Sequence, residues 1–145
     1  MNTPLGLWVE VCIRKYGWVP FLFFSLHLAV SKGLDAYLHF PWLDIPMHFF
    51  GGVAIAFFYW KSLLHPQASK VLGELSSFGR QIFAVAAVGA TTAVWEFAEW
   101  TTDWIGITHA QVSLDDTILD MLLGLLGGGL FVAFMGLKQD KIDVV

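Results

Sequence analysis

The chain has 145 residues, of which 57% are hydrophobic and only 14% are charged, and its mean hydropathy is +0.65. This composition excludes an ordinary soluble domain, and the length leaves room for a single domain, residues 1–145. The net charge of −4 and the small number of basic residues argue against a nucleic-acid partner. We therefore expect a small all-α, polytopic membrane protein.

Four apolar stretches are long enough to cross a bilayer as helices, which takes about 20 residues. They cover residues 18–34, 44–64, 81–105 and 116–137, and they predict a four-transmembrane-helix bundle. The segment before them carries Leu5, Leu7, Trp8 and Val11. This spacing of apolar residues predicts a short helix at the membrane interface.

The basic residues are distributed unevenly around these spans. Seven of the eight Lys and Arg residues flank the two chain termini or the loop between the second and third spans, and only Lys32 lies near the other side. The positive-inside rule then places both termini in the cytoplasm. The loops around residues 35–42 and 106–115 are expected to face outward.

Two of the expected spans enter from outside with polar first turns. Asp44 lies at the boundary of the second span with His48 one turn deeper, and Asp116 lies at the boundary of the fourth with Asp120 one turn deeper. Glycines follow on the same helix faces, and small residues let helices approach closely in lipid. We expect tight packing through these glycines and a polar, outward-facing cavity above them.

The third span runs in the opposite direction, from the cytoplasmic side outward, and its acids reach the same depth in the membrane. Its Glu96, Glu99 and Asp103 share one helix face, and no Lys or Arg lies at this depth. A charged side chain near the bilayer centre costs at least about 2.5 to 3.5 kcal/mol, and neighbouring carboxylates cannot all stay ionised. Either several of these acids are protonated or a divalent cation binds among them.

The predicted metal ligands are six carboxylates and one imidazole: Asp44, His48, Glu96, Glu99, Asp103, Asp116 and Asp120. This donor set suits Mn, Fe, Zn, Mg or Ca. Simpler roles stay open for some members. Asp44 and Asp116 could be first-turn acids that the helix dipole favours, Asp103 could belong to a solvated loop face, and His48 could be a hydrogen-bonded core residue.

The order of these motifs resembles that of two families of small bacterial membrane proteins. The stretches "DIPMHFFGG", "WEFAEW" and "DDTILDMLLGLLGG" follow one another between about residues 44 and 130, as in the VanZ-like and YjdF-like families. The agreement is closer to the YjdF-like branch, through the paired glutamates and the "DT..DM" stretch. The sequence departs from the VanZ-like pattern, because it lacks a Glu-x-x-Gln and an arginine before the last motif. The resemblance implies a multi-pass protein of the bacterial inner membrane, but no particular reaction.

Three classes of function agree with this sequence. The first is a divalent-metal site without an assigned chemistry. The second is a metal-dependent enzyme that acts on a lipid or lipid-linked substrate at the outer leaflet, with Glu96 or Glu99 as the general base. The third is an ion- or proton-coupled carrier, for which four spans are few unless the protein forms a homodimer. Membrane lipids are the expected partners in every case.

Overall fold

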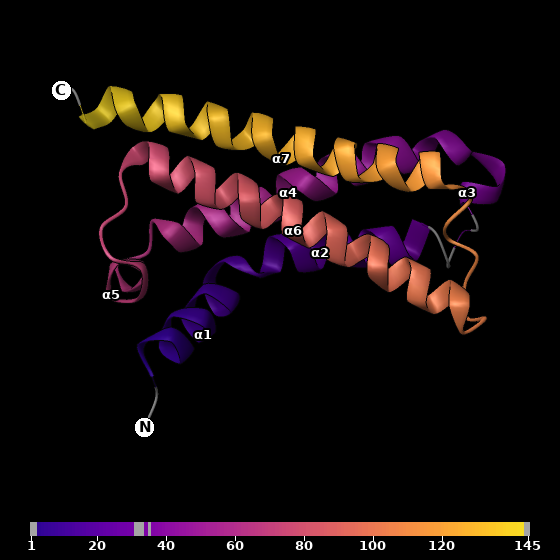
Figure 1. Ribbon diagram of the computed structural model, residues 1–145, viewed down its shortest axis with the longest axis horizontal. Helices are drawn as coiled ribbons and strands as arrows, with labels where there is room; N and C mark the ends of the chain where they lie inside the picture. The colour runs from indigo at the N-terminus through magenta and orange to yellow at the C-terminus, as the bar shows by residue number, and fades with distance from the viewer. Residues whose placement is uncertain (1–2, 31–33, 35, 144–145) are drawn as a thin grey trace.

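The computed structural model describes residues 3–30, 34 and 36–143 (Figure 1). Every regular element in these residues is helical, which confirms the expected all-α class. The elements are α1 (Pro4–Tyr16), α2 (Trp18–Leu28), α3 (Ala36–His39), the 3₁₀ turn η2 (Pro41–Leu43), α4 (Asp44–Leu63), α5 (Gln67–Leu72), α6 (Ser77–Trp104) and α7 (Leu114–Asp143).

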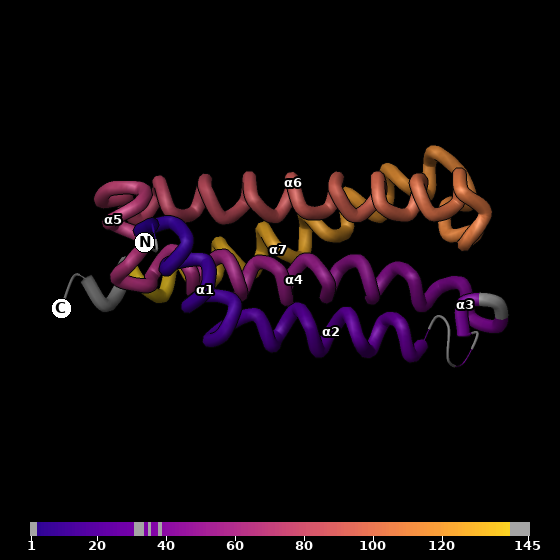
Figure 2. Tube along the Cα trace, turned by 90° about the horizontal axis from the view of Figure 1, so that it is seen from below, coloured from indigo at the N-terminus to yellow at the C-terminus, as the bar shows by residue number. Residues whose placement is uncertain are grey.

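Within the described residues, three helices are long and apolar enough to cross a membrane. The spans that contain α4, α6 and α7 cover Pro41–Leu63, Ser77–Trp104 and Leu114–Gln139. They agree with the second, third and fourth expected spans to within a few residues at each end. Because α7 packs along both α4 and α6, the three form one bundle, which Figures 1 and 2 show from two directions.

The first expected span, residues 18–34, contains α2, a helix of only 11 residues. A helix of this length is about 16 Å long, which is shorter than the hydrocarbon core of a bilayer at roughly 30 Å. Residues 31–33, where the expected span ends, lie outside the described residues. α2 runs beside α4 and packs on it (Figure 2). A fourth membrane crossing therefore stays a prediction.

Glycines bring α4 and α7 into backbone contact. A Cβ atom added to Gly52 would overlap the carbonyl group of Gly124, and one added to Gly127 would overlap the carbonyl group of Phe49. Helices in lipid associate through such close packing, because there is little hydrophobic drive to hold them together. Consequently, the residues one turn before Gly52 and Gly124 are held face to face.

The hydrophobic core lies toward the end of the bundle where α4 ends and α6 begins. Trp60, Val88 and Val132 are fully buried there, one from each long helix. The outer faces of the long helices instead expose large apolar side chains, such as Phe97 at 67% and Leu126 at 56%. Exposed apolar surface on this scale suits contact with lipid rather than with water.

The N-terminal helix α1 packs against α5 and the end of α4. The Trp8 indole N–H donates a hydrogen bond of 3.0 Å to the Ser62 carbonyl, and the Tyr16 ring meets the His65 ring edge-on. Cys12 is buried in this contact. The expected N-terminal helix is present, and Trp8 faces the bundle. Its position at a membrane interface stays a prediction.

The two ends of the bundle differ in charge. Both chain termini and α5 lie at one end, whereas α3 and the link between α6 and α7 lie at the other (Figures 1 and 2). The Lys and Arg residues that the structure describes all belong to the first end, called here the basic end: Arg14, Lys15, Lys61, Lys70, Arg80, Lys138 and Lys141. The second, acidic end holds all of the predicted ligands.

Candidate functional site

Asp44, His48 and Asp120 form a cluster at the acidic end. Asp44 and His48 lie one turn apart on α4, and Asp120 comes from α7. The His48 Nε2 atom is 3.3 Å from Asp44 Oδ1 and 3.7 Å from Asp120 Oδ2. One ligand atom from each residue lies within 4.8 Å of the others. Since metal–ligand bonds to oxygen and nitrogen are about 2.0 to 2.6 Å long, one ion could bind all three donors.

The cluster is largely shielded from solvent. The side chains of Asp120 and His48 are 6% and 12% exposed, whereas that of Asp44 is 31% exposed. Two ionised carboxylates outnumber the one imidazole, and no Lys or Arg at the acidic end belongs to the described residues. Excess negative charge is costly in a membrane-spanning segment. The site therefore requires bound protons or a bound cation.

Two glutamates of α6 lie beside the cluster without joining its donor group. The buried Glu96 accepts hydrogen bonds from the Gln111 amide at its backbone carbonyl, 3.2 Å away, and at its carboxylate, 3.5 Å away. Glu99 accepts one from the Trp95 indole N–H at 2.8 Å. Both carboxylates are close enough to His48 for their charges to interact. They add negative charge around the cluster.

Asp103 binds the backbone of the link that follows α6. Its carboxylate accepts hydrogen bonds from the Thr108 hydroxyl and from the backbone N–H groups of Ala110 and Gln111. These contacts fix the part of the link that places the Gln111 amide beside Glu96. The structure therefore gives Asp103 a local structural role and does not bring it into the donor group.

Asp116 occupies the first turn of α7, where the helix dipole favours a negative charge. Its backbone N–H donates a hydrogen bond of 3.1 Å to the Ser113 hydroxyl, which caps the helix. The negative charge of Asp116 repels those of Asp120 and Glu96, but Asp116 does not belong to the cluster of three donors. Of the seven predicted ligands, the structure thus brings three together.

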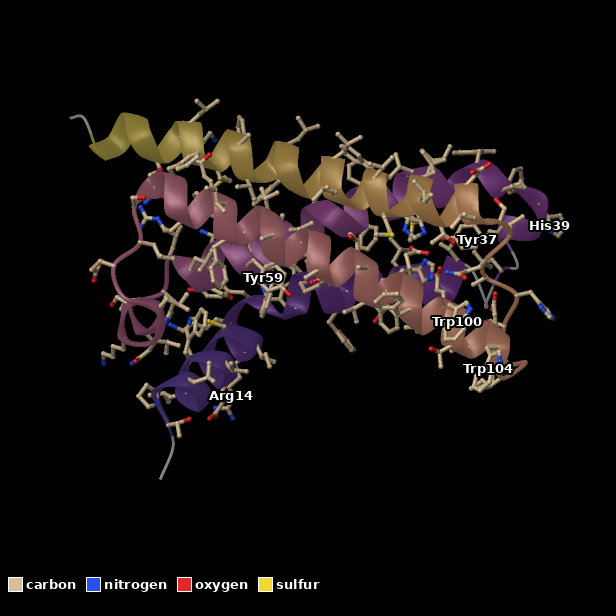
Figure 3. All side chains as sticks on the ribbon, in the orientation of Figure 1. Arg14, Tyr37, His39, Tyr59, Trp100 and Trp104 are labelled. Atoms are coloured by element: carbon tan, nitrogen blue, oxygen red, sulfur yellow. The ribbon has the colours of Figure 1, made fainter. Side chains whose placement is uncertain are left out.

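Sequence reasoning missed three residues that contact this region: Trp95, Gln111 and Tyr37. Tyr37, labelled in Figure 3, lies in α3, and its hydroxyl is 3.1 Å from Nδ1 of His27. Burial and the negative charges of nearby carboxylates raise the pKa of the Tyr37 hydroxyl above its ordinary value. A tryptophan one turn before Glu99 was a usable signal for such a contact, whereas nothing in the sequence marks Tyr37.

A cavity of about 120 Å³ lies next to the cluster, between α2, α4, α6 and α7. His48 and Glu96 line it, and most of the remaining wall is apolar. Trp95 also lines it and meets the rings of Phe24 and His27 at centroid distances of 5.6 and 5.5 Å. These aromatic contacts connect α2 to α6. The polar cluster therefore borders an apolar space inside the bundle.

Together, the long apolar helices and the family comparison define a helical membrane protein. The chain belongs to the DUF2238 family of predicted membrane proteins, whose model matches residues 12–141. It is similar to an uncharacterized protein of Thermotoga maritima, with 31% identity over 103 residues. That match covers 70% of this chain and 52% of the relative, so the matched region is about half the length of the relative. No solved structure matches the chain.

Proposed function

We propose that this membrane protein binds a divalent cation between Asp44, His48 and Asp120. The observation that supports the proposal is the convergence of two carboxylates and an imidazole, from two helices, on a space less than 5 Å across. An imidazole nitrogen among the donors favours Zn, Mn or Fe over Mg and Ca, which prefer oxygen ligands.

Charge supports the same proposal. Two ionised carboxylates and a neutral imidazole carry two negative charges, which one divalent cation offsets. Glu96 and Glu99 are close enough to His48 for their charges to interact, and a cation would offset their charge as well. The competing arrangement is an imidazolium shared by Asp44 and Asp120 without any metal. The two arrangements differ in the metal content of the purified protein, which can be measured directly.

Elemental analysis of the purified protein tests the proposal. Protein prepared without a chelator and without a histidine tag should contain a stoichiometric divalent metal, or should take one up when titrated with Zn, Mn, Fe, Mg and Ca. A metal-free preparation that binds none of these ions would refute the proposal and favour shared protons. Titrations at two pH values add a check, because a metal that displaces a proton from His48 binds more weakly at low pH.

One observation favours a metal-dependent enzyme as a second candidate function. The apolar cavity beside the cluster can hold a short part of a hydrocarbon chain, and its wall includes both His48 and Glu96. A bound metal would polarise an acyl or phosphoryl oxygen of a lipid, and Glu96 would act as the general base. Glu96 suits this role better than Glu99, because Glu96 lines the cavity and Glu99 does not.

The enzyme candidate is tested with labelled lipid extract in mixed micelles. Turnover of one lipid class should depend on added metal and should be lost in Glu96→Gln, while Asp115→Asn, an exposed acid at the start of α7, should leave it unchanged. Equal turnover by the parent and by Glu96→Gln would exclude this role for Glu96.

We further infer four crossings, cytoplasmic termini and a place in the bacterial inner membrane. The gathering of basic residues at one end supports this orientation through the positive-inside rule. α2, which packs on α4, would belong to the fourth crossing. The motif order that resembles the YjdF-like family supports the bacterial inner membrane. The acidic end would then face the periplasm.

A further inference from the structure

A second cavity, also about 120 Å³, lies at the basic end of the bundle. The end of α4, one side of α5 and the link between α5 and α6 line it, and Arg80 reaches it from the first turn of α6. Its wall is mostly polar, in contrast to that of the first cavity. Because a water molecule takes about 30 Å³ of liquid, the space admits a small ionic group.

Arg80 enters this cavity with an unsatisfied donor. Its Nε atom is buried and has no hydrogen-bond partner within the described part of the chain. No ion pair joins its guanidinium to a carboxylate among the same residues. A buried charged donor without a partner is unfavourable, so arginines in such places usually meet an anion. Guanidinium groups match phosphate oxygens especially well.

His65 offers a second donor to the same cavity. Its Nδ1 atom accepts a hydrogen bond of 3.3 Å from the Gln67 backbone N–H, so the neutral ring carries its proton on Nε2. The Tyr16 ring packs against this imidazole and helps to fix its orientation. Glu74 also lines the cavity but is exposed to solvent. Arg80, whose Nε atom is buried, is therefore the cationic group of the cavity wall.

We propose that this cavity binds the phosphate group of an anionic membrane phospholipid. The cavity lies where two spans meet the membrane boundary, since α4 ends at Leu63 and α6 begins at Ser77. Leu64, which lines the cavity, is 37% exposed and offers an apolar contact beside the polar wall for the start of an acyl chain. Basic pockets between spans at the cytoplasmic side are suited to anionic headgroups. The proposal does not depend on the metal site at the opposite end.

The test uses the full chain in detergent, titrated with dioleoyl phosphatidylglycerol, dioleoyl phosphatidylcholine or inorganic phosphate. Native mass spectrometry counts bound lipid, and circular dichroism verifies the helix content of each variant. The parent should bind phosphatidylglycerol in preference to phosphatidylcholine, and Arg80→Gln should weaken this binding about tenfold or more. The matched control is Arg14→Gln, because the Arg14 side chain is 78% exposed and already 3.5 Å from Glu10.

Three results would overturn the proposal: equal binding of the two lipids, an equal loss in Arg14→Gln and Arg80→Gln, or displacement of phosphatidylglycerol by low-millimolar inorganic phosphate. The last result would identify a site for soluble phosphate instead of a lipid. Should Arg80→Gln fail to fold, Glu74→Gln gives an independent answer, since Glu74 is exposed. Removing its negative charge from the rim should tighten phosphatidylglycerol binding severalfold, and unchanged affinity would count against the proposal.

Discussion

His48 of α4 and Asp120 of α7 face each other across a helix interface, with Nε2 of the imidazole 3.7 Å from Oδ2 of the carboxylate. One turn further along each helix, Gly52 and Gly124 bring the two backbones into contact. The separation of His48 and Asp120 is therefore set by helix packing. Variants of the polar pair should therefore change metal affinity, whereas variants of the glycine pair should change the stability of the bundle.

Asp120→Asn should empty the proposed metal site while leaving the fold intact. The amide keeps the size of the side chain but removes the charge, so metal affinity should fall by roughly one to two orders of magnitude. The metal-free form should become slightly more stable, because crowded negative charge is relieved. Isothermal titration with metal and thermal melts followed by circular dichroism measure the two effects. Glu99→Gln should weaken metal binding less, since Glu99 lies outside the donor group.

A matched control for this variant is Asp115→Asn, which changes an exposed acid on the same helix. Its metal affinity should equal that of the parent. If Asp120→Asn also binds metal as tightly as the parent, Asp120 is not a ligand. The cluster is then held by a protonated His48 between the two carboxylates rather than by a metal.

Gly52→Ala should destabilise the bundle, because the added methyl group would overlap the Gly124 carbonyl. Overpacking of this kind costs about 1 to 3 kcal/mol. Gly129→Ala is the control on α7: a Cβ atom there meets nothing within 4 Å. The control should be neutral or more stable by up to about 1 kcal/mol, since alanine favours a helix. Unfolding in mixed micelles monitors both variants, and equal stabilities would contradict the packing argument.

Cysteine labelling tests the orientation of the bundle. Lys70→Cys lies at the basic end and Ala110→Cys at the acidic end, and both positions are exposed. A membrane-impermeant maleimide added to intact cells should label only the cysteine at position 110, and the cysteine at position 70 should react after permeabilisation. The parent serves as the background control because Cys12 is buried. Labelling of both positions from one side would refute the proposed topology.

Tyr37 should remain protonated in alkali, because burial and nearby negative charges raise the pKa of its hydroxyl. In the unfolded chain a tyrosine ionises near pH 10. The contribution of this group to stability is therefore complete below about pH 10 and declines as the pH rises further. Ultraviolet difference spectra of the parent and Tyr37→Phe should coincide near 295 nm between about pH 9 and pH 11. A phenolate band present only in the parent would show that Tyr37 ionises normally.

The sequence allowed the helical class and the long spans to be predicted, because apolar runs of this length have few other structures available. It also allowed the meeting of Asp44, His48 and Asp120 to be anticipated. Residues four apart share a helix face, and the glycines that follow on the same faces indicate which helices approach each other. The meeting of the three donors thus follows from helix periodicity together with these glycines.

The rest of the site depends on side-chain directions that periodicity does not specify. Asp103 shares a helix face with Glu96 and Glu99, yet its carboxylate binds the link at Thr108, because unpaired backbone N–H groups are nearby. Gln111 lies in that link, and its contact with Glu96 depends on how the link folds. Equally, helix periodicity could not indicate the length of α2.

The different contacts around the first cavity determine how a molecule could enter it. Entry between α4 and α7 would require two backbones in direct contact to separate along the helix axes, which breaks many contacts at once. Between α2 and α6, the rings of Phe24 and His27 meet that of Trp95, and rotation of these side chains would open a gap without moving a long helix. The route of lowest resistance is thus lateral, from the lipid phase past these rings. Replacement of Phe24 by a smaller residue would change the rate of exchange more than the affinity.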